Sequence, residues 1–210
     1  GVNDKQLKRS LMNMSGMSFN ALPPISIPFR FFATAIAFML VIAAFIFSSG
    51  ESLWISRWHP LMLALTHGLT LGFITPIMMG ALLQMLPVVG GIGMSNVKSV
   101  GRFCYPLHFL GTGLLILGFV STHAWQANIK ILAIICLGLS FSYYIYSVIY
   151  VVKQYFNQQL AKHVFDQNPT IVVIGYSIVA LLVTVILGGI LQVQGAGFAF
   201  SSAFSFDKSY

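Results

Sequence analysis

Charged residues are scarce in this chain. Only 7% of its 210 residues are Asp, Glu, Lys or Arg, whereas 57% are hydrophobic. Soluble domains carry about 25% charged residues, so this composition excludes an ordinary soluble domain and indicates an integral membrane protein. The net charge of +7 comes from basic residues in tails and loops. Such residues set membrane topology, and here they do not indicate nucleic-acid binding.

Acidic residues are the rarest charged residues, and all four lie outside the apolar segments: Asp4, Glu51, Asp166 and Asp207. Proton-driven transporters usually carry an ionisable residue within their bundle. A transporter is therefore the least supported function class. The chain also has no nucleophile–base–acid pattern and no phosphate-binding loop, so the sequence does not predict that it is an enzyme on its own.

Cysteine is nearly absent as well. Cys104 and Cys136 are the two cysteines, and no CxxC pattern occurs. This excludes a disulfide framework and a conventional zinc site. Both residues fall within apolar segments, where we expect buried structural thiols.

Long apolar segments make up most of the chain. Five of them reach the roughly 20 residues that a helix needs to cross a bilayer: 28–49, 59–87, 103–122, 129–152 and 170–194. None alternates with period two, as barrel strands do. The sequence predicts an all-α, polytopic helical membrane bundle over 28–194, with an N-terminal tail (1–27) and a C-terminal tail (195–210).

The basic residues are distributed unevenly between the two ends of this bundle. Eight lie on the side of the N-terminus: Lys5, Lys8, Arg9, Arg30, Lys98, Arg102, Lys153 and Lys162. Three lie on the opposite side: Arg57, Lys130 and Lys208. Because cytoplasmic loops are rich in Lys and Arg, the N-terminus is predicted to be cytoplasmic.

His67 lies inside the second apolar segment, roughly 12 Å from its outer end at about 1.5 Å per residue. An ionisable residue at this depth is costly and by default indicates a function. Three interpretations remain open: a neutral imidazole bonded to a neighbouring helix, a metal or haem ligand, or a group that transfers protons or ions. Gly68 and Gly72 would let a flat cofactor or another helix approach closely.

Two further histidines are predicted at the outer end. His59 lies at the boundary beside Arg57 and Trp58, which favours an interface anchor over a metal ligand. His123 follows the third segment next to Trp125 and is a weaker candidate ligand. Together with His67 they form the set of possible outer ligands.

The remaining histidines are expected elsewhere. His108 enters from the cytoplasmic side, and we expect it to be shallow and too far in depth from His67 to share one iron. His163 is expected in a solvated loop. The face of His67 continues through residues that a porphyrin could contact: Thr70, Ile74, Met78 and Met85. Pro76 removes one backbone hydrogen bond from this helix and predicts a kink.

Two motifs resemble a known family. The second segment contains HGLTLGF at 67–73, GALL at 80–83 and Pro87, and the first contains PFRFF at 28–32. These motifs resemble those of NnrS proteins, which are grouped with the haem–copper oxidase subunit I superfamily. The resemblance implies a haem b protein of the bacterial inner membrane, active in electron transfer or in the response to nitric oxide or oxygen. It implies that His67 is an axial ligand. If the protein binds haem, we expect Arg57 or Trp58 to contact the propionates at the outer rim.

The chain departs from that family in ways that matter for metal binding. Leu65 and Gly68 stand where NnrS proteins have a further histidine and an acid, so the resemblance does not carry a copper site. A second ligand to a haem would come from His59 or His123, from a second copy of the chain or from a partner membrane chain. The alternative function is a cofactor-free assembly or interaction subunit, whose glycines mark helix–helix contacts: Gly68, Gly72, Gly111, Gly118, Gly188 and Gly189.

Overall fold

A computed structural model of the chain describes residues 24–90, 97–161 and 169–195. Within these ranges all regular structure is helical. Five helical stretches are long and apolar enough to cross a membrane: Ser26–Trp54, Pro60–Val88, Val97–Val120, Gln126–Gln158 and Ile171–Leu191. The predicted all-α bundle with five spans is confirmed, and the protein is a multi-pass membrane protein.

The first, fourth and fifth spans are built on single α-helices: α2 (Ser26–Ser49), α7 (Gln126–Ala161) and α8 (Pro169–Gly195). The second and third each contain a π-helical stretch. The second consists of α3 (Pro60–His67), the π-helical η3 (Gly68–Ile74) and α4 (Thr75–Gly90). The third consists of α5 (Val97–Ser99), the π-helical η4 (Val100–Cys104) and α6 (Tyr105–Val120). A 3₁₀ turn, η2 (Gly50–Trp54), follows α2.

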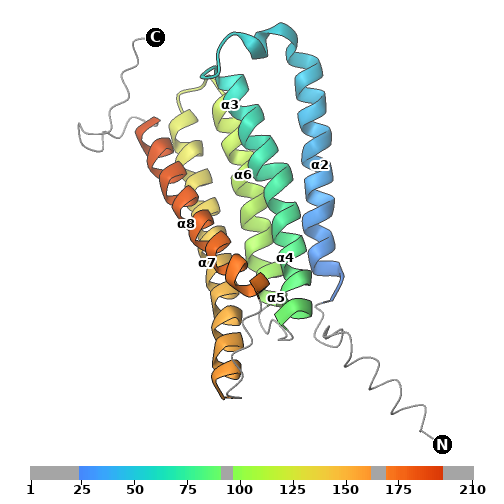
Figure 1. The fold of residues 1–210 in the computed structure, drawn as a ribbon. Helices are drawn as coiled ribbons and strands as arrows, with labels where there is room; N and C mark the ends of the chain where they lie inside the picture. Colours follow the sequence, from blue (N-terminus) through green and yellow to red (C-terminus); the bar gives the residue numbers. More distant parts are fainter. Residues whose placement is uncertain (1–23, 91–96, 162–168, 196–210) are drawn as a thin grey trace, which may run out of the picture.

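The helices stand side by side, and neighbours in sequence are neighbours in space (Figure 1). α2 packs on η3 and α4, α3 packs on α6, and α6 packs along α7. α8 contacts mainly α7. It is the least enclosed of the five spans. In its most apolar 18-residue segment 11% of the residues are buried, compared with 44% for the fourth span. The second span is therefore held between α2 on one side and α6 on the other.

Helix ends differ from the predicted segments in two places. The third helical stretch begins at Val97 rather than at 103, and α7 continues to Ala161 rather than to 152. Hydropathy marks the part of a helix that lies in lipid, whereas polar residues such as Lys98 continue the same helix beyond it. Figure 1 shows the lower part of α7 extending past its neighbours. The predicted tails, 1–27 and 195–210, fall almost wholly outside the described residues.

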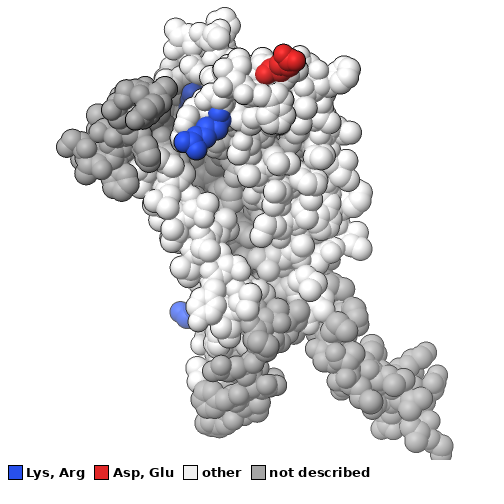
Figure 2. All heavy atoms as spheres, turned by 45° about the horizontal axis from the view of Figure 1, so that its top comes forward, with Lys and Arg blue, Asp and Glu red and all other residues white. Residues whose placement is uncertain are grey.

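Charges lie at the two ends of the described bundle. One end carries Arg30, Lys98, Arg102 and Lys153, and the other carries Arg57, Lys130 and Glu51. On the face shown in Figure 2, the surface between the ends is uncharged. This is the asymmetry that predicted a cytoplasmic N-terminus.

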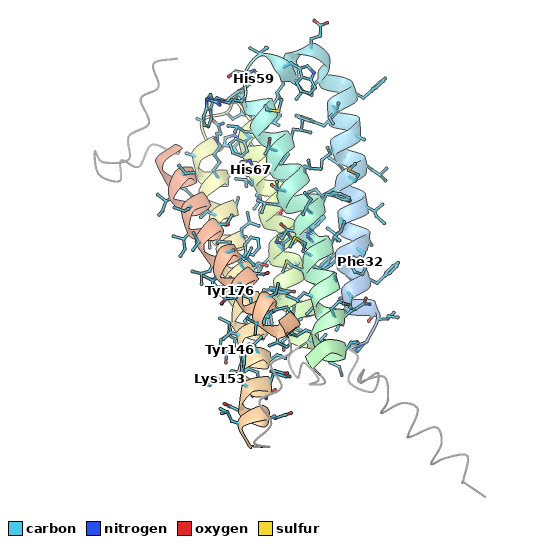
Figure 3. All side chains as sticks on the ribbon, in the orientation of Figure 1. Phe32, His59, His67, Tyr146, Lys153 and Tyr176 are labelled. Atoms are coloured by element: carbon cyan, nitrogen blue, oxygen red, sulfur yellow. The ribbon has the colours of Figure 1, made fainter. Side chains whose placement is uncertain are left out.

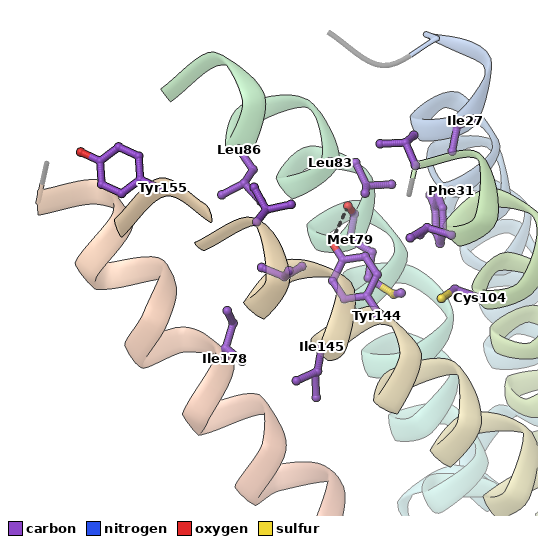
Figure 4. Close-up of a cluster of buried hydrophobic side chains, with 14 of the residues drawn as sticks. Ile27, Phe31, Met79, Leu83, Leu86, Cys104, Tyr144, Ile145, Tyr155 and Ile178 are labelled. Atoms are coloured by element: carbon purple, nitrogen blue, oxygen red, sulfur yellow. Dashed lines mark hydrogen bonds between the residues drawn. The ribbon is translucent and has the colours of Figure 1, made fainter. Parts of the chain in front are cut away.

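Buried apolar side chains form two clusters along the bundle. The cluster nearer the start of α2 includes Phe31, Leu83 and Tyr144 (Figure 4). The other includes Leu115 and Phe119 of α6 with residues of α3 and α7. Both cysteines are free; Cys104 is buried in the first cluster, as expected, and Cys136 is half-buried.

A hydrogen bond from α7 to α4 crosses the first cluster, because the Tyr144 hydroxyl donates to the Met79 carbonyl at 2.9 Å (Figure 4). Tyr144→Phe removes this donor without a change of volume. We expect it to lower the free energy of unfolding by about 1 kcal/mol, measured by detergent-induced unfolding. Tyr146→Phe is the matched control, since Tyr146 is exposed; equal losses for the two variants would refute the assignment.

Candidate functional site

The middle of the second span, η3, has the backbone hydrogen bonds of a π-helix, which join residues five apart. The N–H of Thr75 donates to the carbonyl of Thr70, five residues back. The next residue, Pro76, has no N–H to donate. The carbonyl of Leu71 therefore receives no bond from Thr75 or from Pro76. The break predicted at Pro76 takes this form, and it leaves a backbone acceptor in the interior of the bundle.

His67 is the last residue of α3, directly before this π-helix, and lies in the upper part of the bundle (Figure 3). Its Nδ1 is 2.7 Å from the carbonyl oxygen of Leu63, one turn earlier in the same helix. The ring is half-buried and packs on Phe119 of α6, with centroids 5.0 Å apart. Because a carbonyl only accepts, Nδ1 donates a proton in this contact, and in the neutral ring the lone pair is on Nε2.

This hydrogen bond bears on the interpretations of His67. The ring bonds its own helix and not a neighbouring one. A histidine that ligates a metal commonly donates its other N–H to a backbone carbonyl, which fixes the tautomer and the ring orientation. In the neutral tautomer with its proton on Nδ1, the lone pair on Nε2 of His67 is available to coordinate a metal.

His59 lies at the start of α3 and is part of the helix cap. Its Nδ1 accepts from the N–H of Leu61 at 3.4 Å, with Pro60 at the first helical position. Capping of this kind stabilises a helix start. Eight residues of helix place it about 12 Å from His67. Arg57 is exposed and lies over the ring of Trp58, 5.3 Å from the centroid, as expected of an interface anchor.

His123 lies in the connection between α6 and α7. It is exposed and stacks on Trp125, with centroids 5.4 Å apart and ring planes at 6°. Among residues 24–90, 97–161 and 169–195, no three His, Cys, Asp or Glu side chains gather closely enough to hold a metal ion. His59, His67 and His123 therefore form no three-ligand cluster in the described part of the chain.

Gly68 and Gly72 face α2. A Cβ atom on Gly72 would lie 2.7 Å from the Phe38 ring, and one on Gly68 would lie 3.3 Å from Ile42. The clearance predicted for a flat cofactor is therefore filled by side chains of α2. In the described structure these two glycines pack against the first helix, which is the arrangement that the helix-contact alternative predicts.

Another face of the second span is uncovered by the described helices. Thr70 is exposed there, and further along Ile74, Met78 and Met85 retain 43%, 64% and 54% of their exposure. This exposed face runs along η3 and α4, the two elements that follow His67 in the chain.

Lys130 is a residue that sequence reasoning assigned only to topology. Its Nζ lies 4.8 Å from the centroid of the Phe119 ring, the same ring on which His67 packs. The stem of Lys130 lies against Gly118, where an added Cβ would be 2.8 Å from the lysine Cγ. A cation thus lies one aromatic ring away from His67. The lysine stem fits here because Gly118 of α6 has no side chain. The two residues are twelve positions apart in different helices, so the sequence does not predict this contact.

His108 is buried in the interior of the bundle. It lies in the middle of the stretch Val97–Val120, is 2% exposed, and bonds Leu71 through Nε2 at 2.8 Å. The third helical stretch begins six residues earlier than predicted, but the added residues include Lys98 and Arg102, so the expected shallow position in the membrane stays a prediction. The Nε2–H of His108 donates to the carbonyl that Pro76 leaves without a backbone partner. The predicted loop residue His163 lies outside the described residues.

Comparison of the chain with protein-family models, with curated proteins and with solved structures gives no match. The resemblance to NnrS proteins accordingly stays a prediction.

Proposed function

We propose that the protein binds haem b in a bacterial inner membrane, with the Nε2 of His67 as an axial ligand, and acts in electron transfer or in the response to nitric oxide or oxygen. The observation that carries this proposal is the bond between His67 Nδ1 and the Leu63 carbonyl. It leaves Nε2 as the free, basic nitrogen of a histidine held at membrane depth.

The surroundings of His67 suit an anionic tetrapyrrole. Phe119 supports one side of the imidazole, and the exposed apolar side chains of Ile74 and Met78 supply a wall. Lys130, which lies over the same Phe119 ring as His67, is a second cation besides Arg57 that would pair with a propionate. When bound, haem supplies one-electron redox chemistry or binding of small gases. The chain holds the imidazole in one tautomer and orients its ring.

The second axial position is assigned to another chain. His59 caps α3 and His123 stacks on Trp125, so each already has a contact of its own. A second copy or a partner membrane protein that covers the exposed face of η3 and α4 would bring a facing ligand.

The test is the visible spectrum of the protein, extracted from membranes after haem supplementation, in oxidised and reduced forms. We expect a Soret band that falls at least about tenfold per protein in His67→Ala, since changes around a ligand already cost about 10–100-fold in metal affinity. His123→Ala is the matched control and keeps the band. A colourless wild-type protein, or an undiminished band in His67→Ala, overturns the proposal.

The second candidate function is a cofactor-free assembly subunit. It is favoured by the packing of α2 on Gly68 and Gly72, which uses these glycines for helix contact. In this case the same preparation is colourless, and a second membrane protein co-purifies in fixed stoichiometry.

A further inference from the structure

His108 and Thr112 form a polar pair in the interior of the bundle, one turn apart on α6. Their exposed fractions are 2% and 0%. The His108 ring lies edge-on to Phe141 of α7, with centroids 5.5 Å apart. The pair is separate from the His67 site and does not depend on the proposed function.

Each member of the pair has a polar atom without a protein partner. The Nε2–H of His108 donates to the Leu71 carbonyl at 2.8 Å, so the ring is either neutral, with a lone pair on Nδ1, or protonated on both nitrogens. A charged imidazole in this apolar interior is unfavourable, which leaves Nδ1 as an acceptor with a lone pair. In the described structure neither this Nδ1 nor the Thr112 hydroxyl oxygen has a hydrogen-bond partner.

Unpaired polar atoms at this depth are costly, because lipid and apolar side chains offer them no hydrogen bonds. Residues four apart on a helix have Cβ atoms about 5–6 Å from each other. One water molecule with hydrogen bonds of about 2.8 Å can therefore reach both atoms. Buried waters typically satisfy polar groups that the protein leaves unpaired.

We propose that this pair is the binding site of a single structural water molecule, which donates to His108 Nδ1 and shares a hydrogen bond with the Thr112 hydroxyl. The water fixes the His108 tautomer, and the tautomer keeps Nε2–H directed at the Leu71 carbonyl. In this way a solvent molecule contributes to the link between α6 and the π-helix η3.

The test is solid-state NMR of the full chain in lipid bilayers, with ¹⁵N-labelled histidine and magnetisation transfer from water. The His108 signals are assigned by their loss in His108→Gln. We expect a water contact at His108 Nδ1 in the wild-type protein. The contact falls severalfold in Thr112→Val, which removes the hydroxyl at constant volume, and is retained in Thr112→Ser.

Two results overturn the proposal. If wild-type His108 Nδ1 shows no contact with water and Thr112→Val shifts its resonance, the threonine hydroxyl bonds the ring directly. If neither a contact nor a shift is seen, the pair binds no water. Because the wild-type measurement alone decides between contact and no contact, poor folding of a variant does not leave the proposal untested.

Discussion

Replacing His108 with leucine is expected to lower the free energy of unfolding by about 1–3 kcal/mol, the cost of a buried acceptor left without a partner. The Leu71 carbonyl has no bond from Thr75 or from Pro76, and it accepts from His108 Nε2. Leucine fills a similar volume but offers no donor. The measurement is unfolding in mixed micelles with increasing SDS, followed by circular dichroism.

Two variants separate the hydrogen bond from simple loss of the ring. His108→Gln keeps an amide donor and is expected to recover at least half of the loss. His123→Leu makes the same change at an exposed position, where surface substitutions alter stability by less than about 0.5 kcal/mol. Equal stability of His108→Leu and the wild-type protein would contradict the role of the Leu71 carbonyl.

Gly72→Leu is expected to have the largest effect of any substitution considered. A Cβ at this position lies 2.7 Å from the ring of Phe38 in α2, a distance that requires the helix or the ring to move. Overpacking of a well-filled interior costs about 1–3 kcal/mol or more, and here the added side chain separates α2 from η3. We expect little folded protein after extraction in mild detergent, measured as the monodisperse fraction in size-exclusion chromatography.

Gly188→Leu provides the comparison for this variant. Gly188 lies in α8, and a Cβ there meets nothing within 4 Å, so this variant is expected to be recovered like the wild-type protein. Gly72→Ala adds only the Cβ and should lie between the two. Comparable recovery of Gly72→Leu and Gly188→Leu would show that α2 does not pack on Gly72 in the membrane.

The sequence predicts the class and the number of spans because hydrophobic length is a local property. It also predicts that His67 lies inside the second span, which begins at Pro60. It cannot predict which face of that helix is covered, because apolar residues surround the whole helix and lipid and protein interior select the same side chains. The position of α2 over Gly68 and Gly72 therefore appears only in the structure.

His108 shows a second limit of sequence reasoning. The sequence predicts a loop at Lys98 and Arg102, whereas in the structure helical residues begin at Val97 and His108 is buried. The hydrogen-bond partner of His108 could not be predicted either, because the acceptor is a backbone carbonyl, which every residue has. Pro76 indicated that a carbonyl would be freed, but only the π-helical register identifies that carbonyl as the one of Leu71.

The length of α7 has a consequence for whatever meets the protein from the aqueous side. Its 36 residues extend about 54 Å at about 1.5 Å per residue, while the hydrocarbon layer is about 30 Å thick. Part of this excess lies in the C-terminal turns of α7, which extend past the neighbouring helices (Figure 1). A soluble molecule docked on these turns would be kept at a set height above the headgroups rather than resting on them.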